Sequence, residues 1–433
     1  MKPLLKTIAL LLATATAPAA MALTGDVNGD NIVNGSDVTS LYGYLLDNTP
    51  VNGNADVNND GSVSGADVTA LYNILLNPQE EKPAVLVGGD ISMFPRYEEN
   101  NARYFDLSGA RVTDVLGYLK QLGWNAFRLR LFVNPENASA TDRNDGVIQN
   151  LDYVKTLGKR IKDNGFQFML DIHYSDSWAD PAHQTLPAAW KSLSTEQLIA
   201  KVGEYTTQVL TELKAAGAEP DLIQTGNEIT YGMLWPSGHV WPAGGGQDGG
   251  SWDNFVAYLR AASSACRQVC PDAKIIIHAA MTKNSNNPIN FYKTLKPYNL
   301  DYDVIGLSYY PAYSGSVAVL ETVLRNIEST EPDKEIMIVE TGYSYAWAMN
   351  DTSFDLSSTY PYSEEGQRKI TADIVAKLKT HEAVTGLFWW WPEQNDYYTY
   401  PQVTPSWWNA SLVDSRNGRF QAAAAELPKL LEE

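Results

Sequence analysis

The chain has 433 residues, with 51 acidic and 32 basic side chains and a formal net charge of −19. Its length exceeds what one small core requires, so we expect a catalytic-size domain together with a smaller one. Because an acidic chain repels phosphate groups, nucleic acid and membranes with anionic surfaces are poor partners for it.

The first 22 residues have the pattern of a signal peptide. Lys2 and Lys6 form a positive start, residues 8–17 are apolar, and Ala20-Met21-Ala22 is a small-x-small cleavage site. The apolar stretch is too short to span a bilayer. We therefore expect a soluble, secreted protein, located outside the cell, in a cell-surface complex or in a periplasm.

Residues 25–46 and 55–76 form an internal repeat with an offset of 30 positions. In each copy, oxygen-bearing side chains occupy positions 1, 3, 5, 9 and 12 of a loop, and position 7 offers a main-chain carbonyl, which is the ligand pattern of an EF-hand calcium loop. The expected ligands are Asp26, Asn28, Asp30, Ile32, Asn34 and Asp37 in the first loop, and Asp56, Asn58, Asp60, Ser62, Ser64 and Asp67 in the second. Apolar helices are predicted over 41–46 and 71–76.

Charge supports a metal in this segment. Residues 23–78 contain seven Asp and no Lys, Arg or Glu, and two calcium ions would offset four of these negative charges. The segment resembles a dockerin module over residues 25–77, and this resemblance implies binding to a cohesin module on a scaffold protein. Loop positions 10 and 11, often Ser-Thr in dockerins, are Gly35-Ser36 and Gly65-Ala66 here, so the identity of the partner stays open.

Residues 79–87 are predicted to be a linker, and residues 88–433 a catalytic domain. Strand-like and helix-like runs alternate after the linker. Strands are predicted at 85–92, 126–132, 167–172, 222–225, 274–278, 304–308, 335–340 and 384–390, and helices at 152–164, 195–216, 254–269, 317–328 and 364–380. Eight strands with intervening helices predict an α/β fold of the (β/α)8 TIM-barrel type. A doubly wound sheet is the alternative, but no glycine-rich phosphate loop follows a strand.

Ionisable or aromatic side chains lie at the carboxyl ends of seven of these strands. They are Arg128 and Arg130, His173, Asn227 and Glu228, His278, Tyr309 and Tyr310, Glu340, and Trp389 to Trp391, in strand order from the second to the eighth. A single residue of this kind is weak evidence. Because the carboxyl ends of all barrel strands meet at one mouth, seven together predict an active site there.

Two glutamates on the fourth and seventh strands suggest a retaining glycosidase, in which two carboxyl groups lie about 5–5.5 Å apart. We assign Glu228 as the acid/base, with Asn227 beside it as a hydrogen-bonding partner for a sugar hydroxyl. Glu340 is the nucleophile, held ionised by Arg128 or Arg130. The two histidines, His173 and His278, are expected to hold both carboxylates in place.

Residues 88 to about 420 resemble glycoside hydrolase family 53, the endo-β-1,4-galactanases. The matching stretches are GGDISMFP (88–95), NAFRLRLFVNP (125–135), DIHYSDSWADPAHQTLPAAW (171–190), QTGNEITYGMLWPSGH (224–239), VIGLSYYP (304–311) and VETGYSY (339–345). The resemblance implies retaining hydrolysis within β-1,4-galactan, the side chains of pectic arabinogalactan, and the same roles for Glu228 and Glu340. Another retaining glycanase on the same barrel, or a non-catalytic carbohydrate-binding barrel, are the alternatives.

Several other positions are candidates for substrate or metal binding. The family usually reads close to FYWEP at the eighth strand, where Trp391 replaces an acidic residue and leaves the subsites open. The substrate-binding candidates are Asp90, Asp176, Asp180, Trp178, Trp235, Tyr309, Trp390 and the pair Trp407-Trp408. The segment 350–355 is a candidate for a third calcium ion. Cys266 and Cys270 are expected to be free thiols, and a monomer is the simplest expectation.

Overall fold

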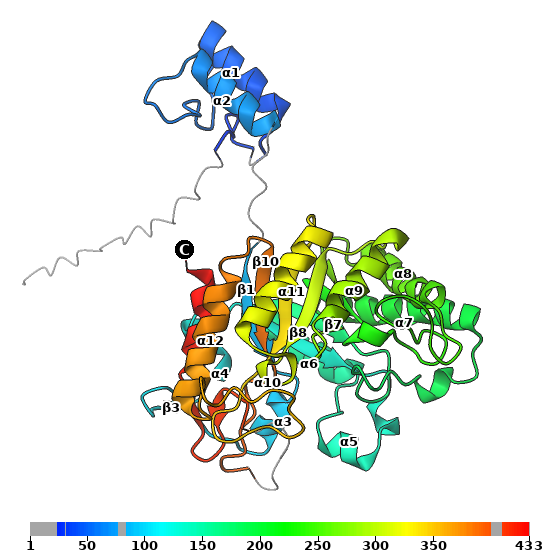
Figure 1. The fold of residues 1–433 in the computed structure, drawn as a ribbon. Helices are drawn as coiled ribbons and strands as arrows, with labels where there is room; N and C mark the ends of the chain where they lie inside the picture. Colours follow the sequence, from blue (N-terminus) through cyan, green and yellow to red (C-terminus); the bar gives the residue numbers. More distant parts are fainter. Residues whose placement is uncertain (1–23, 31, 77–83, 400–408, 433) are drawn as a thin grey trace, which may run out of the picture. The chain divides into compact units, whose positions relative to one another are not determined.

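The computed structural model describes residues 24–30, 32–76, 84–399 and 409–432. The chain divides into two compact units, Met1–Pro83 and Ala84–Glu433 (Figure 1). The predicted signal peptide and residues 79–83 of the predicted linker lie outside the described residues. Within the described ranges, no helix combines the length and the apolar character that a membrane span requires.

The first unit contains two helices, α1 (Gly35–Asp47) and α2 (Gly65–Leu76), which pack against each other (Figure 1). Both begin earlier than the predicted apolar runs, because loop residues cap them. In α1, Asn34 accepts a hydrogen bond from the main-chain NH of Ser36, and Asp37 accepts one from Asn34. The unit has a small apolar core of its own, made of Val27, Val38, Leu41, Ala55, Val57, Val68 and Leu71.

The second unit is built on a closed barrel of eight parallel strands, which confirms the predicted fold (Figure 1). The strands follow the order β1-β10-β9-β8-β7-β6-β5-β4 around the barrel. Their bounds are β1 (Leu86–Asp90), β4 (Ala126–Leu131), β5 (Gln167–Ile172), β6 (Leu222–Thr225), β7 (Lys274–Ala280), β8 (Val304–Tyr309), β9 (Glu335–Thr341) and β10 (Val384–Trp389). The barrel thus begins at Leu86, two residues inside the segment predicted as linker.

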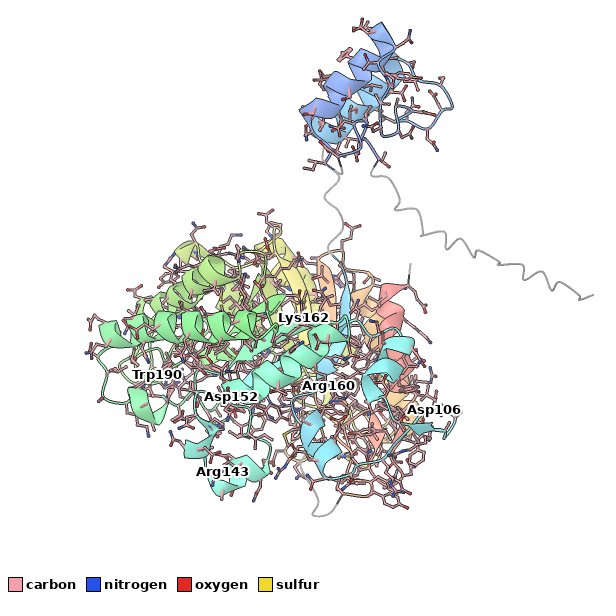
Figure 2. The ribbon with its side chains drawn as sticks, turned by 180° about the vertical axis from the view of Figure 1, so that it is seen from behind. Asp106, Arg143, Asp152, Arg160, Lys162 and Trp190 are labelled. Carbon is pink, nitrogen blue, oxygen red and sulfur yellow. The ribbon has the colours of Figure 1, made fainter. Side chains whose placement is uncertain are left out.

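Helices lie outside the barrel strands. The longer ones are α6 (Leu151–Asp163), α7 (Thr195–Ala215), α8 (Trp252–Val269), α9 (Asn286–Leu295), α11 (Val317–Thr330) and α12 (Glu364–Leu378), and the shorter ones are α3 (Phe94–Glu99), α4 (Val115–Gln121), α5 (Ala140–Asn144), α10 (Pro311–Ser314) and α13 (Ala423–Glu426). Figure 2 shows α6 from outside, with Asp152, Arg160 and Lys162 on its solvent side. Its buried positions Val154, Leu157 and Ile161 recur at helical spacing.

Short elements complete this unit. Turns of 3-10 helix are η1 (Pro135–Asn137), η2 (Ala188–Trp190), η3 (Ile229–Tyr231), η4 (Lys296–Tyr298) and η5 (Leu427–Leu431). A separate small sheet has the order β11 (Val413–Asp414), β12 (Arg419–Phe420), β2 (Tyr104–Phe105) and β3 (Arg111–Val112). The two cysteines are buried, free thiols, as expected.

The barrel interior changes character along its axis. Apolar side chains, among them Leu86, Met169 and Met337, form a cluster near the amino-terminal ends of the strands. Arg128 lies two residues beyond Ala126 of this cluster on β4, Asp171 lies two residues beyond Met169 on β5, and both are fully buried. A barrel interior is normally filled by apolar layers, so buried charges at the carboxyl ends mark this end as the functional one.

Candidate active site

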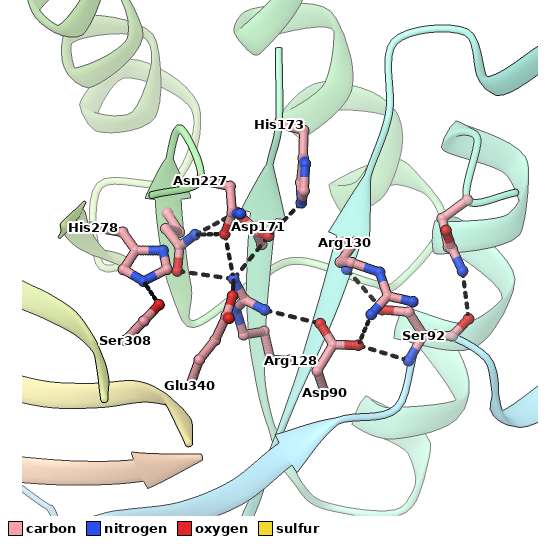
Figure 3. A network of polar contacts seen from close by, with 12 residues as sticks. Asp90, Ser92, Arg128, Arg130, Asp171, His173, Asn227, His278, Ser308 and Glu340 are labelled. Carbon is pink, nitrogen blue, oxygen red and sulfur yellow. Dashed lines mark hydrogen bonds and ion pairs between the residues drawn. The ribbon is translucent and has the colours of Figure 1, made fainter. Parts of the chain in front are cut away.

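Arg128 on β4 is the centre of a buried polar network (Figure 3). Its Nη1 donates to Asp90 Oδ2 at 3.0 Å, and its Nη2 lies 2.9 Å from oxygens of Asp171, Asn227 and Glu340. The four partners come from β1, β5, the end of β6 and β9. One guanidinium therefore ties together strands on all sides of the barrel mouth, and its charge is matched by carboxylates.

Glu340 on β9 is a carboxylate held by one ion pair and one hydrogen bond. Arg128 contacts its Oε1 at 2.9 Å, and the Tyr310 hydroxyl donates to its Oε2 at 2.8 Å. Burial raises the pKa of Glu340 to about 7, against the opposing effects of Arg128 and of the Tyr310 hydrogen bond. Both contacts favour the charged form, so we place the negative charge of the site on Glu340.

Glu228 follows the end of β6 through Gly226 and Asn227. Its backbone is left-handed, with φ of 47° and ψ of 46°, a conformation that is unusual for a residue with a side chain. Burial, followed by the charge of Glu340, raises the pKa of Glu228 well above its usual value. Among the described residues no cation forms an ion pair with Glu228, and this difference from Glu340 favours a protonated Glu228.

The two predicted histidines do not hold the glutamate carboxylates directly. His278 accepts a hydrogen bond from the main-chain NH of Glu228 at its Nδ1 (3.2 Å), and its Nε2 lies 2.7 Å from the Ser308 hydroxyl. Ser308 in turn hydrogen-bonds the Glu228 side chain. His173 accepts from Ala179 NH and contacts Asp171. His278 thus reaches the Glu228 side chain through Ser308, and His173 reaches Glu340 only through Asp171 and Arg128, so the expected support of the two carboxylates stays a prediction.

Burial, followed by the charge of Arg128, lowers the pKa of His278 well below its usual value, so the ring is neutral. Because Nδ1 accepts from Glu228, the ring proton lies on Nε2 and is donated to Ser308. Ser308 then has its own proton available for Glu228. The chain from His278 through Ser308 thus positions both the main chain and the carboxyl of Glu228.

A cavity of about 270 Å³ opens over this network. Its lining residues are Asp145, Trp178, Ala179, Asp180, Asn227, Glu228, Tyr310, Glu340, Trp390 and Trp391. Beside it, the Arg130 guanidinium lies 5.0 Å from the Trp178 ring, 4.7 Å from Trp390 and 5.3 Å from Trp391. Arg130 therefore anchors an aromatic wall by cation–π contacts rather than contacting Glu340.

Tyr309 is placed away from the cavity, which corrects its role as a binding candidate. Its hydroxyl donates to Gly315 O, and the residue belongs to the last position of β8. Successive strand residues point to opposite faces, so Ser308 and Tyr309 cannot both face the barrel interior. Tyr310, the next residue, reaches Glu340 instead.

Some of the other binding candidates line the cavity, and others contact neighbouring residues outside it. Trp178, Asp180, Asn227 and Trp390 line the cavity, whereas Asp90 pairs with both arginines. Asp176 accepts hydrogen bonds from Asn134 and Asn137, and Trp235 stacks on His239 with ring centroids 3.7 Å apart. Trp407 and Trp408 lie outside the described residues.

Sequence reasoning missed Asp171, Ser308 and Asp145. Asp171 and Ser308 lie inside strands, where alternation with buried apolar neighbours was the available signal. Asp145 follows the short helix α5 and had no motif around it. Glu393, two residues after Trp391, is also buried, and its Oε1 accepts from Met93 NH. Burial raises the pKa of Glu393 well above its usual value. An acidic residue therefore does follow the eighth strand, two positions after the one at which the family pattern has it.

The oxygen atoms of the two N-terminal loops are of the kinds that bind calcium. Asp37 accepts hydrogen bonds from the main-chain NH groups of Val27, Asn28 and Asn34, and Asp67 accepts from Asn58 and Ser64. In each loop an Asn side chain also donates a hydrogen bond to the Asp two residues further on, Asn28 to Asp30 and Asn58 to Asp60. Both loops therefore close around carboxylate and amide oxygens, the ligands that calcium takes.

In the described ranges, no three Asp, Glu, His or Cys side chains are grouped as a metal site. The two ions and their ligand sets therefore stay predictions. In the segment 350–355, Asn350 O accepts from the Tyr313 hydroxyl and Asp355 accepts from Ser357 NH. The third ion likewise stays a prediction.

Comparison with known proteins identifies both units. The model of glycosyl hydrolase family 53 matches residues 86–428, and that of the dockerin type I domain matches residues 24–80. The chain is 31% identical to an endo-β-1,4-galactanase of Bacillus subtilis, over 71% of this chain and 70% of that protein. It is 33% identical to an arabinogalactan endo-β-1,4-galactanase of Thermothelomyces thermophilus, over 62% and 78%.

A solved structure agrees. The family 53 catalytic domain of Ignisphaera aggregans is similar with a TM-score of 0.69 and 31% identity, covering 82% of this chain and 98% of that one. Both resemblances inferred from the sequence are thus confirmed. The chain belongs to glycosyl hydrolase family 53 and carries a dockerin type I domain before its catalytic barrel.

Proposed function

We propose that this protein hydrolyses internal linkages of β-1,4-galactan, including the galactan side chains of pectin, with retention of configuration. The names of the relatives support the substrate. The observation that carries the mechanism is the unequal pair of carboxyls in one cavity, Glu340 paired with Arg128 and Glu228 without such a cation.

The first step uses both carboxyls at once. Glu340 attacks the anomeric carbon while the bond to the leaving oxygen breaks and Glu228 gives that oxygen its proton. In the second step Glu228, now ionised, takes a proton from water, and the water oxygen replaces Glu340 at the anomeric carbon. Glu228 is protonated again at the end, so the site returns to its starting state.

Arg128 and Tyr310 support these steps through Glu340. Both contacts hold its oxygens in fixed positions, and the arginine balances its charge before attack. Asn227 contacts Arg128 through its Oδ1 and Ala179 O through its Nδ2. We propose that it orients a sugar hydroxyl next to Glu228.

We also propose export and docking for this chain. The pattern of residues 1–22 supports export, and the dockerin type I match supports binding of a cohesin-bearing scaffold in the presence of calcium. Two calcium ions, one in each loop, fit the repeated donor sets. A monomer bound to such a scaffold is the proposed working form.

The test is hydrolysis of linear β-1,4-galactan beside xylan, mannan and cellulose, with Glu340→Ala and Glu228→Ala measured in parallel. We expect hydrolysis of galactan alone, with kcat reduced at least about 1,000-fold in each variant, since each loses a group that forms or breaks a bond. Thr322→Ala, an exposed change on α11, serves as the control.

Other outcomes separate the alternatives. Hydrolysis of another glycan, lost in both variants, would keep the mechanism and change the substrate. A folded wild-type protein that binds galactan and hydrolyses none of the four polysaccharides would favour a non-catalytic carbohydrate-binding barrel.

A further inference from the structure

We propose that a second groove, on the loops after β6 and β7, binds the leaving-side sugars of the substrate chain, with Trp241 as a stacking platform. The groove has a volume of about 640 Å³. Residues 231, 241–244, 282–284, 287 and 290 line it. The inference rests on the proposed function, because it identifies where part of the same substrate lies.

The position of the groove follows from Glu228. The turn η3 (Ile229–Tyr231) begins at the next residue, and Tyr231 forms one wall of the groove. The other wall follows β7, the strand that carries His278, whose ring contacts Glu228 NH. Asn287 joins the two walls by donating to the Tyr231 hydroxyl at 2.8 Å.

This location matches the leaving side of the reaction. An acid that protonates the leaving oxygen must lie beside it, so the sugars released in the first step lie near the loop that carries Glu228. In the aromatic wall, Trp390 and Trp391 follow β10, which lies four strands from β6 around the eight-stranded barrel, whereas Trp178 follows β5, the neighbour of β6. The two surfaces therefore suit opposite portions of one chain bound across the barrel mouth.

The groove has the side chains that a neutral polysaccharide requires. Trp241 is 52% exposed, a large fraction for this ring, and Tyr231 contacts it edge-on with centroids 6.2 Å apart. Thr282, Asn284 and Asn287, which line the same groove, bring amide and hydroxyl groups to it. A flat apolar ring and hydrogen-bonding groups in one groove can take the apolar face and the hydroxyls of a sugar together.

The main chain of Trp241 is held in place by hydrogen bonds that do not involve its indole ring. Trp241 NH donates to Gly245 O, and Trp241 O accepts from Trp252 Nε1, both at 3.0 Å. Gly244 and Gly245 have φ of 100° and 86°, which only glycine adopts easily. Since main-chain contacts fix the turn, Trp241→Ala removes the ring and leaves its support in place.

The experiment compares two substrates that differ on the leaving side. Linear β-1,4-galactan places sugars there, whereas 4-nitrophenyl β-1,4-galactobioside places only an aryl group. We expect Trp241→Ala to lower kcat/KM on galactan about tenfold, the loss of one aromatic contact worth about 1.4 kcal/mol, and to leave the aryl substrate unchanged. Trp241→Phe should retain most activity on galactan.

Controls distinguish the possible failures. Tyr42→Ala removes another exposed aromatic ring (42% exposed) from α1, in the other unit, and should change the kinetics on neither substrate. Unchanged galactan kinetics in Trp241→Ala, or equal losses on both substrates, would overturn the groove assignment while wild-type activity stands. A wild-type protein inactive on both substrates would instead overturn the proposed function, and this inference with it.

Discussion

In the proposed mechanism, different surroundings give Glu228 and Glu340 different roles. Glu340 has a cation and a tyrosine hydroxyl on its two oxygens, whereas Glu228 has a serine hydroxyl and the negative field of Glu340. Both pKa values are raised, that of Glu340 to about 7. The active state has one proton on the pair, so kcat/KM should follow a bell-shaped pH profile with both limbs above the ordinary glutamate range.

The contact between Ser308 and Glu228 predicts the direction of a pH shift. This hydrogen bond favours ionised Glu228 and lowers its pKa, so Ser308→Ala should raise that pKa further. Glu228 must be protonated for the first step, and the alkaline limb of the kcat/KM profile should therefore move to higher pH, with a lower kcat. Ser108→Ala, on an exposed turn, is the control. An alkaline limb that moves to lower pH would contradict this arrangement.

At the scale of residues, the sequence identified charged and aromatic groups but not their contacts. Glu228, Glu340 and Arg128 could be recognised because charged residues are unusual within, or directly after, an apolar strand. The choice of Tyr309 failed because β8 includes that residue and points its side chain away from the site. Ser308 was missed because alternation with apolar neighbours is common to many strand serines, and its role becomes visible only when the fold places His278 2.7 Å from it.

At the scale of elements, apolar runs located the barrel. The predicted strands over 167–172 and 222–225 coincide with β5 and β6, and helix α7 differs from its prediction by one residue. Helix α9 was missed: it has no side-chain cap at Ser285 and contains Pro288. The strands of the small sheet contain two residues each, too few for a periodic pattern.

Gly88 on β1 tests the close approach between barrel strands. A Cβ there would lie 2.0 Å from Ala126 O, a main-chain atom of β4 that cannot move alone. Gly88→Ala should lower the free energy of unfolding by about 2 kcal/mol or more, measured by urea denaturation.

Gly203 provides the matched control for this prediction. It lies inside helix α7, and the closest atom to its added Cβ is 3.7 Å away. Gly203→Ala should therefore stabilise by about 0.5–1 kcal/mol, because alanine favours the helix. Equal effects of the two substitutions would contradict the packing of β1 against β4.

At the scale of the whole molecule, two units with separate cores carry separate tasks. The proposed catalytic residues belong to Ala84–Glu433, and the repeated acidic loops belong to Met1–Pro83. The repeat was evident from the sequence because its oxygen ligands recur at a fixed offset. The boundary was less clear, since a linker has no pattern of its own and β1 begins with ordinary apolar residues.

Removing calcium should therefore affect one unit alone. With a chelator, the uncompensated Asp side chains of the loops repel one another, and residues 24–76 of the full chain should become open to limited proteolysis. Hydrolysis of galactan should continue, and added calcium should restore protection. A proteolysis pattern that is indifferent to the chelator would contradict the proposed calcium loops.

The most direct test of the central claim is the configuration of the first product. Linear β-1,4-galactan is mixed with the wild-type protein, and the anomeric protons are followed by NMR before the released sugars equilibrate. Because Glu340 is proposed to form a covalent intermediate, the β-anomer should appear first and the α-anomer only later by mutarotation. An α-anomer that appears first would mean that water attacks directly, and the roles assigned to Glu228 and Glu340 would be wrong.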